Sequence, residues 1–457
     1  MKNKRMKRII SASIVVVFLA ACQSTGQKKE SAVIEAPQMS DSALLDSVQY
    51  YSIKYFTDGA EPTSGLARER FHADNIYPDN DKNVVTSGGS GFGVMALIVA
   101  MDRKFITREE GLQQLEKIVR FLETSDRFHG AFPHWWNGET GKVKPFGQKD
   151  NGGDIVETSY MMQGLLCVRQ YFKDGNEKEK ALATRVNKLW KEVEYDWYRH
   201  GQNVLYWHWS PTYDWQMNFP IRGYNECMIA YILAASSPTH GVPAEVYHEG
   251  WAEGGKITQH HASLGFPLRL RYQGNPQNGA PLFWSQYSYL GLDPQGLKDK
   301  YTDYWIENSS QAMINYTWCV ANSLKYKGYG ENNWGLTASY SVKGYAAHAP
   351  NPNDDLGVIS PTAALAAMPY TPEKSIAAMK HWYYDMHDKL WGQYGFYDAF
   401  SETDNWYLPR YLAIDQGPIP VMIENYRTGL LWKLFMSCPE IQDGLKKLGF
   451  ESPWIKK

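Results

Sequence analysis

The sequence predicts an all-α protein, a toroid in which an inner and an outer ring of helices surround one core. Helix-period segments recur along almost the whole chain. They alternate between amphipathic segments with a charged face and segments that are apolar nearly all round. A helix that is apolar on every side is surrounded by protein, so the alternation favours two concentric layers. No internal sequence repeat supports the ring, which rests on the number and alternation of the helices.

The expected helices follow apolar residues that recur every three or four positions. Charged faces are clear at 107–124 and 177–199, whereas 91–103, 161–168 and 224–236 are apolar on every side. In chain order the predicted helices are 41–56, 91–103, 107–124, 154–172, 177–199, 224–236, 299–326, 361–368, 372–387 and 417–435, with shorter candidates near 243–252 and 439–448.

The loops before several apolar helices are long and rich in Gly, Trp, Tyr and Asn. Structureless loops of this length are usually functional or disordered, and these are too aromatic to be disordered. We expect them to gather at one end of the toroid and form a cleft. They are 57–90, 125–153, 201–223, 254–285, 327–357 and 391–415.

The N-terminus has the pattern of a bacterial lipoprotein signal, which we place at residues 1–21. The basic 2-KNKRMKR-8 precedes the apolar 9-IISASIVVVFLA-20, and small residues lead directly to a cysteine in 19-LAAC-22. We expect lipidation of Cys22, a flexible tether over 22–40 and a folded domain over 41–457. The protein would then be a membrane-anchored lipoprotein facing the periplasm or the cell surface, with the leaflet left open. The alternative is an ordinary secretory signal with a chance cysteine.

Charge and ligand content exclude several classes of partner and cofactor. The formal net charge is -2, and no basic stripe is present beyond the N-terminal signal, so a nucleic-acid partner is not expected. The 12 histidines are scattered, and 259-QHHAS-263 lacks further ligands at metal spacing. We therefore expect no metal site, no cofactor and a monomer. The cysteines after Cys22 are far apart and are expected to be buried free thiols; they are Cys167, Cys227, Cys319 and Cys438.

Three carboxylates gather in 149-KDNGGDIVETSYMMQGLL-166, just before an apolar helix. Asp154 and Glu157 alone match a capping box, with Asp at the N-cap and Glu three residues later. A cap needs no third acid, yet Asp150 adds like charge close by. Carboxylates clustered at an energetic cost are typical of sites with shifted pKa values.

Two further acids, Glu226 and Asp415, also lie at or just before apolar helices. The alternative for each is a role at the helix N-terminus, by dipole or by capping. The functional interpretation of Glu226 is a carboxyl in an apolar wall, kept protonated to act as a general acid. If the helices form a ring, the N-termini of its inner helices open on one rim. The acids would then converge, as two-carboxylate glycoside hydrolysis requires.

Several loop residues are candidates for binding a sugar, because aromatic rings with a polar tip stack on sugars. Core packing is the alternative for each tryptophan. Arg68 and Arg70 in 65-GLARER-70 could bind sugar hydroxyls, and the alternative for both is an ion pair with an acid such as Glu69. The candidates are Trp135, Trp136, Trp334, Arg68 and Tyr224.

Seven segments in order make the sequence resemble the bacterial glucoamylase-like proteins of glycoside hydrolase family 144, the β-1,2-glucanases. They are 65-GLARER-70, 86-TSGGSGFGVMAL-97, 150-DNGGDIVETSYMMQGLL-166, 223-GYNE-226, 333-NWGLTAS-339, 357-GVISPTAALAAMPY-370 and 414-IDQGPIPVMIENYRTGLLW-432. The resemblance implies an (α/α)6 barrel and hydrolysis of β-1,2-glucan with inversion. It also implies that acids matching Asp150, Asp154, Glu157, Glu226 and Asp415 line the cleft, with Glu226 as the general acid.

On this basis we expect protonated Glu226 to act on the leaving oxygen and Asp154 or Asp415 to take the proton of the attacking water. Asp150 and Glu157 would hold sugar hydroxyls. The family contains endo-acting members and exo-acting members that release sophorose. Because the loops at 254–285 and 327–357 would close one end of a cleft, we favour exo action, with endo action as the alternative. A non-catalytic glycan-binding lipoprotein and a polysaccharide lyase are the rivals from other classes.

Overall fold

The computed structural model describes residues 38–77, 81–272 and 279–455. The predicted signal at 1–21, Cys22 and most of the predicted tether lie outside these ranges. The chain divides into two compact units, Met1–Ser40 and Asp41–Lys457, and the helices and strands of the described ranges belong to the second unit. Within the described ranges, no helix combines the length and the apolar character needed to cross a bilayer.

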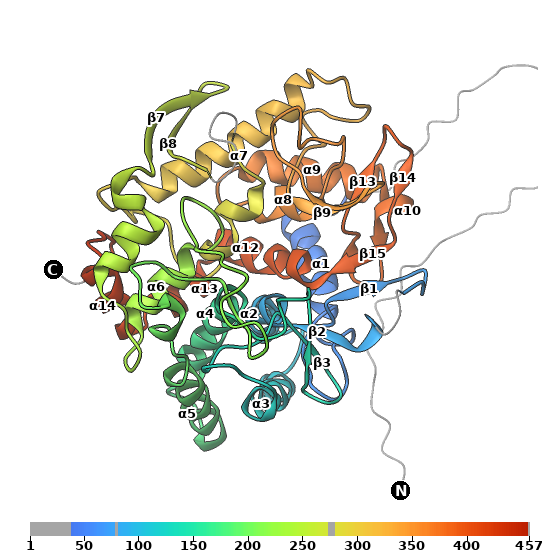
Figure 1. Ribbon diagram of the computed structural model, residues 1–457. Helices are drawn as coiled ribbons and strands as arrows, with labels where there is room; N and C mark the ends of the chain where they lie inside the picture. Colours follow the sequence, from blue (N-terminus) through green and yellow to red (C-terminus); the bar gives the residue numbers. More distant parts are fainter. Residues whose placement is uncertain (1–37, 78–80, 273–278, 456–457) are drawn as a thin grey trace, which may run out of the picture. The chain divides into compact units, whose positions relative to one another are not determined.

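Helices dominate the second unit, which confirms the predicted helix-rich class (Figure 1). Several predicted segments differ from the structure: 224–236 begins as an α-helix only at Met228, 299–326 is shortened to Tyr304–Ala321, and the candidate near 243–252 forms a π-helical turn rather than an α-helix. The segment 417–435 is broken at Gly429, which has a φ of 69° that favours glycine, and 177–199 ends as an α-helix at Lys191. The helices are α1 Asp41–Lys54, α2 Ser87–Asp102, α3 Arg108–Thr124, α4 Ile155–Phe172, α5 Glu177–Lys191, α6 Met228–Ser236, α7 Tyr304–Ala321, α8 Pro361–Ala366, α9 Pro372–Tyr384, α10 His387–Leu390, α11 Ala413–Gln416, α12 Pro418–Arg427, α13 Leu430–Met436 and α14 Pro439–Lys447.

The long loops contain short antiparallel strands, which the prediction of an all-α chain did not include. Buried loop backbone must pair its N–H and C=O groups, and two-residue to six-residue ladders do so. The pairs are β1 Arg70–His72 with β15 Arg410–Leu412, β2 Val84–Thr86 with β3 Trp135–Asn137 and β4 Val143–Lys144, β5 Gly153–Asp154 with β6 His208–Trp209, β7 Thr258–Ser263 with β8 Phe266–Leu270, β9 Ala338–Ser341 with β10 Gly344–Ala347, β11 Trp391–Gly392 with β12 Gly395–Phe396, and β13 Phe400–Ser401 with β14 Trp406–Tyr407.

The helices are of two kinds, as the alternation of apolar segments predicts. In α2 every residue but the last is buried, and α4 is buried along almost its whole length. In contrast, α3 and α5 bury one face and begin with capping boxes, Thr107 with Glu110 and Asn176 with Glu179. Figure 1 shows α3 and α5 outside α2 and α4, and α2 contacts α3 while α4 contacts α5.

Glycines allow α2 and α4 to approach closely. A Cβ on Gly91 would lie 2.4 Å from the Tyr160 carbonyl oxygen, and one on Gly164 would lie 2.1 Å from the Gly91 carbonyl oxygen. Because neither distance is physically accessible, both positions require glycine. The close contact sets the spacing of the two helix N-termini, which lie at Thr86 and Asp154.

The four cysteines of this unit are buried free thiols, as expected. They are Cys167, Cys227, Cys319 and Cys438.

Candidate active site

A cavity of about 430 Å³ lies where several of these helices begin. Its walls include Glu157 from the first turn of α4, Glu226 from the turn before α6, and Ile414 from α11. Volume and lining are those of a small-ligand site, with apolar and aromatic walls and a few polar groups. The lining residues are Glu69, Arg70, Thr86, His134, Trp135, Phe146, Glu157, Tyr160, Trp207, Glu226, Phe283, Tyr287, Ala338, Tyr340, Tyr345, Ala347, Leu412 and Ile414.

Glu226 lies in a half-buried turn that two hydroxyl groups hold in place. Its carbonyl oxygen accepts hydrogen bonds from Ser288 Oγ at 2.6 Å and from the Tyr160 hydroxyl at 3.3 Å. The sequence predicted Glu226 in the first turn of a helix over 224–236. In the structure the α-helix begins only at Met228, so Glu226 lies two residues before it. Burial raises the pKa of Glu226 to about 7, and the charges of Glu157 and Asp154 add to the rise. A large protonated fraction at neutral pH suits a general acid.

Glu157 faces the same cavity and is anchored on α2. Its Oε2 accepts a hydrogen bond from the Gly88 N–H at 2.7 Å, across the α2–α4 contact. Burial raises the pKa of Glu157 to about 7, against the lowering effect of the His134 charge. The side chain does not reach back to the backbone of Asp154, whose N–H donates to Phe132 instead. The reciprocal capping box that the sequence pattern suggested is therefore absent.

Asp154 is the N-cap of α4, so the capping alternative is correct for this residue. Its Oδ1 accepts from the N–H groups of Val156 and Glu157, both at 2.9 Å. Its Oδ2 accepts from Trp207 Nε1 at 3.0 Å. Both oxygens of this fully buried carboxylate are thus already engaged, and Asp154 does not line the cavity.

Two histidines that were not among the predicted site residues lie against Asp154 and Asp150. His134 Nδ1 is 3.2 Å from Asp154 Oδ2 and 3.7 Å from Asp150 Oδ2. His208 Nε2 is 3.3 Å and 3.2 Å from the same two oxygens. The antiparallel pairing of β5 with β6 places His208 opposite Asp154. We call these four residues the His–Asp cluster.

In the His–Asp cluster the pKa values favour positively charged imidazoles and a negatively charged Asp154. Burial would lower the pKa of His134, but the charge of Glu157 and the contacts with Asp154 and Asp150 raise it to about 9. Burial would also lower the pKa of His208, but Asp154 and Asp150 raise it to about 10. Burial would raise the pKa of Asp154, yet the two imidazoles hold it well below its usual range.

Asp150 does not line the cavity, and its side chain is 2% exposed. The prediction that it holds a sugar hydroxyl is therefore wrong, because it faces the two histidines instead.

Asp415 lies beside Tyr287, another wall of the cavity, and beside a second buried acid. Its Oδ1 accepts from the Tyr287 hydroxyl at 3.4 Å. A hydrogen bond between Asp415 and Asp398 forms only when one of the two carboxyls is protonated, because two carboxylates have no proton to share. Burial raises the pKa of both, that of Asp398 to about 6, and the charge of Asp398 raises the pKa of Asp415 in addition. Asp415 lies within α11 and makes no capping bond, so the N-cap alternative is wrong here.

Four of the five predicted sugar-binding residues do not line the cavity. Trp136 and Trp334 are fully buried in the core, where their Nε1 atoms donate to the carbonyl oxygens of Asp126 and Lys374. Tyr224 is also buried and donates to Asn308 at 2.6 Å, while the Arg68 guanidinium donates to the Lys82 carbonyl. The stacking predicted for the two tryptophans is wrong, because core packing leaves no ring face free.

Trp135 does line the cavity, and Arg70 lies over its ring at 5.8 Å. Arg70 also pairs with Glu69, which is the ion-pair alternative that the sequence left open, and both residues contribute charge to the cavity wall. A signal for the histidines was present in the sequence. His134 and His208 adjoin tryptophans in loops, in 134-HWW-136 and 207-WHW-209.

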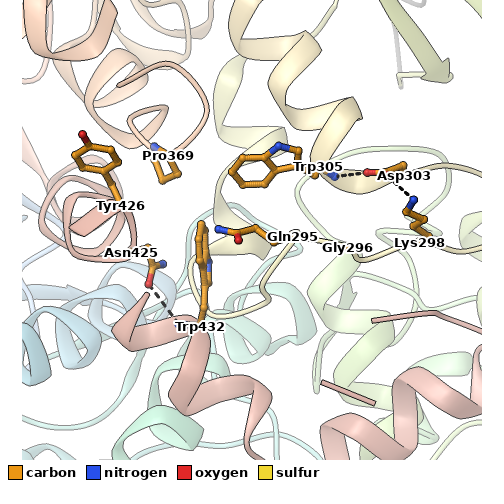
Figure 2. A pocket seen from close by; sticks show the side chains of 9 residues that line it. All are labelled: Gln295, Gly296, Lys298, Asp303, Trp305, Pro369, Asn425, Tyr426 and Trp432. Atoms are coloured by element: carbon orange, nitrogen blue, oxygen red, sulfur yellow. Dashed lines mark hydrogen bonds and ion pairs between the residues drawn. The ribbon is translucent and has the colours of Figure 1, made fainter. Parts of the chain in front are cut away.

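A second cavity of about 530 Å³ is larger but holds no comparable chemistry. Figure 2 shows its lining side chains, with the Asp303–Lys298 ion pair at one edge. Asp303 is the only carboxylate in its wall. It caps α7 through Trp305 and Ile306 and pairs with Lys298 at 3.1 Å. Of these two cavities, the one that holds Glu157 and Glu226 therefore has the side chains for acid–base chemistry.

The chain is similar to a known protein family and to several known proteins. Residues 218–439 match the family model Glycoamylase, described as "Putative glucoamylase". The chain is 47% identical over 426 residues to the exo beta-1,2-glucooligosaccharide sophorohydrolase (non-reducing end) of Parabacteroides distasonis. That match covers 90% of this chain and 58% of the relative, so the chain spans less than two thirds of the relative's length.

Two solved structures are also similar. One is an endo-beta-1,2-glucanase from Chitinophaga pinensis in complex with sophorotriose and glucose. It is 68% identical, with a TM-score of 0.91, 91% of this chain covered and 100% of that chain. The other is a beta-1,2-glucanase from Parabacteroides distasonis, 45% identical with a TM-score of 0.85, covering 90% of this chain and 60% of that chain. The identity and the full coverage of the first structure show that the chain belongs to the glucoamylase-like Glycoamylase family.

Proposed function

We propose that this chain is a glycoside hydrolase of family 144 that cleaves β-1,2-glucan or its oligosaccharides with inversion at the anomeric carbon. The observation that carries the proposal is Glu226, a half-buried carboxyl with a raised pKa in one cavity with Glu157 and Tyr287. The names of three relatives, each a β-1,2-glucan or β-1,2-glucooligosaccharide hydrolase, support the substrate class.

In the proposed reaction Glu226 donates its proton to the glycosidic oxygen as the bond from that oxygen to the anomeric carbon breaks. A water molecule attacks the anomeric carbon from the opposite face. Its proton passes through the Tyr287 hydroxyl to Asp415, the partner at 3.4 Å. Of the two bases left open by the sequence, Asp415 is favoured because both oxygens of Asp154 already accept hydrogen bonds. An inverting pair works across about 6.5–9.5 Å, which leaves room for the water.

The remaining cavity residues would bind the substrate. Glu157 would accept a hydrogen bond from a sugar hydroxyl, since its Oε2 is anchored by Gly88 and its carboxyl faces the cavity. Trp135 offers an aromatic ring at the wall for stacking on a sugar. Arg70, paired with Glu69, supplies further donors beside that ring.

We further propose that the helices close into an (α/α)6 toroid, with the long loops forming the cleft. Contacts run from α2 to α4 and from α4 to α6. They continue through the segment Leu282–Tyr289, where Ile229 N–H donates to Ser288 Oγ and Gln286 donates to the Ala363 carbonyl of α8. From α8 they pass to α12 and back to α2. An unbroken circuit of this kind supports a ring of inner helices.

Exo action with release of sophorose remains our expectation, supported by the name of the 47% identical relative. Endo action is the second candidate, because the 68% identical relative is an endo-beta-1,2-glucanase. Size analysis of the products of linear β-1,2-glucan decides between them. Exo action gives sophorose alone from the first time point, whereas endo action gives a ladder of chain lengths.

The mature protein is proposed to be a monomer anchored by lipid on Cys22 and facing the periplasm or cell surface. The lipobox-like 19-LAAC-22 supports this. A Cys22→Ser variant of the full chain should leave the membrane fraction and should not incorporate labelled palmitate. Unchanged membrane association would contradict the anchor.

The decisive variant for the activity is Glu226→Gln, which preserves shape and removes the acid. We expect the hydrolysis rate to fall by at least about 10³-fold, near the middle of the range for general acid–base groups. Calorimetric binding of β-1,2-glucooligosaccharide should stay within a few-fold of the unmodified protein. Glu177→Gln, at a side chain that is 94% exposed, is the matched control. Retention of the full rate by Glu226→Gln would refute the assignment.

A further inference from the structure

The His–Asp cluster has the donor set and spacing of a metal site, although the sequence led us to expect none. Its four facing atoms are His134 Nδ1, His208 Nε2, Asp150 Oδ2 and Asp154 Oδ2, and they all lie within 4.8 Å of one another. The four nitrogen–oxygen distances are 3.2, 3.2, 3.3 and 3.7 Å. Ligands at about 2.0–2.1 Å from a tetrahedral zinc ion lie about 3.3 Å apart, and three of the four nitrogen–oxygen distances are within about 0.1 Å of that value.

The donor atoms are buried and lack ordinary hydrogen bonds. His134 Nδ1, His208 Nε2 and Asp150 Oδ2 have no hydrogen-bond partner, even though each lies close to an atom of opposite charge. The two ring nitrogens therefore face the space between the carboxylate oxygens without directing an N–H at either oxygen. Buried polar atoms without partners are rare and call for an explanation, and a shared cation supplies one.

The surrounding structure holds the donors in place. Asp154 Oδ1 caps α4, and Asp154 Oδ2 accepts from Trp207 Nε1, which leaves that oxygen a second lone pair. The β5–β6 pairing fixes His208 opposite Asp154. The ring of His134 stacks on Phe146 with centroids 4.2 Å apart and planes 13° apart. Outer contacts that orient ligands in this way are characteristic of metal sites.

We propose that His134, Asp150, Asp154 and His208 bind one divalent transition-metal ion, with zinc as the best match. Two imidazole nitrogens with two carboxylate oxygens suit zinc, whereas calcium and magnesium take six or more oxygen ligands. The two carboxylates balance the charge of the dication. The ion would join the segment after Phe132, the start of α4 and strand β6. Because His134 also lines the cavity, the bound ion would stabilise the wall that carries Glu157.

The test uses the full chain and zinc itself. Protein dialysed against a chelator is titrated with zinc by calorimetry, and the bound metal is measured by elemental analysis. We expect one zinc per chain and a higher Tm on reloading. The His208→Gln variant should lose more than about 100-fold in affinity, above the range for outer contacts alone. The matched control is His381→Gln, whose ring pairs with Asp385; it should bind zinc like the unmodified protein.

A readout on the unmodified protein guards against misfolding of the variant. Cobalt added to the chelated protein should give the intense visible absorption of a four-coordinate site, and zinc should abolish it. A cluster that holds only protonated imidazoles would bind no metal and give no absorption, which would overturn the proposal. Equal zinc binding by His208→Gln and the unmodified protein would overturn it too. Neither readout uses a glucan, so failure here is distinct from failure of the proposed hydrolase activity.

Discussion

Two pairs of buried carboxyl groups lie beside the same cavity and are in opposite electrostatic states. Asp150 and Asp154 meet two imidazoles, and the imidazoles hold the pKa of Asp154 well below its usual range despite burial. Asp398 and Asp415 meet each other, and within the described residues neither forms an ion pair. Burial raises the pKa of Asp398 to about 6 and raises that of Asp415 well above its usual value. Identical side chains at similar depth thus differ because their neighbours differ.

The difference separates a structural role from a chemical one. A carboxylate held by a cap, an indole and the charge of two imidazoles stays ionised and does not accept a proton readily. A pair of carboxyls that shares one proton carries one negative charge and can accept a second proton. The base for an attacking water is therefore expected in the Asp398–Asp415 pair, which contacts the cavity through Tyr287.

Among the variants that test these two roles, Asp415→Asn should have the largest effect on activity. Removing the base should lower kcat by about 10²–10⁴-fold while KM changes little, because general bases contribute in this range. Steady-state kinetics on β-1,2-glucooligosaccharide measures it, with Asp443→Asn on the exposed side of α14 as control. A variant that keeps more than half of the original kcat would place the base elsewhere.

Tyr287→Phe removes the hydroxyl between the cavity and Asp415. We expect kcat to fall by about 100-fold, less than for loss of the base itself, because water can replace part of a relay. The comparison variant is Tyr426→Phe, at a ring that is 41% exposed. An unchanged kcat would show that the proton reaches Asp415 by another route.

Asp398→Asn should shift the pH dependence rather than abolish activity. Asp415 must be ionised to act as a base, so the rate rises as pH rises through its pKa. Loss of the neighbouring negative charge lowers that pKa, so the rising limb should move to lower pH. The falling limb, set by protonated Glu226 with its pKa of about 7, should stay in place.

The same variant should change how stability depends on pH. The folded-state pKa of Asp398 is raised to about 6, so folding favours its protonated form. Asp398 should therefore contribute about 2 kcal/mol more to the stability of the unmodified protein at pH 4 than at pH 7. Asp398→Asn should lack this gain in denaturant unfolding experiments. An identical gain in both proteins would contradict the raised pKa.

The smallest effect on the turnover rate is expected for Trp207→Phe, a variant beside the His–Asp cluster. It removes one hydrogen bond to Asp154 at 3.0 Å and keeps an aromatic wall for the cavity. The free energy of unfolding should fall by about 1.5–3 kcal/mol, the usual contribution of a bond to a charged group. The turnover rate should change by less than about 10-fold. Trp197→Phe is the control, and a loss of rate as large as that of Asp415→Asn would erase the distinction between the two pairs.

The sequence predicted the parts of the fold that depend on local pattern. Helical spacing and cap residues located α3, α4 and α5 within a few residues, apart from the early end of α5, because both signals act within one or two turns. Acids at helix starts predicted the convergence of Glu157 and Glu226 on one cavity.

What the sequence did not predict depends on contacts between distant segments. His208 meets Asp154 only through the register of β5 and β6, and Asp398 meets Asp415 only through packing around β15 and α11. The neighbours Trp135 and Trp136 look equivalent in the sequence, yet strand alternation sends one ring to the cavity and the other into the core. Pairing and packing, rather than residue type, decided these roles.

Proton NMR of the first products from linear β-1,2-glucan tests the central claim most directly. An attack by water opposite the leaving group, with Glu226 as acid, predicts that newly formed reducing ends appear as the α-anomer. They should then equilibrate with the β-anomer by mutarotation. Initial formation of the β-anomer, or no new reducing ends after long incubation, would contradict the proposed inverting hydrolysis.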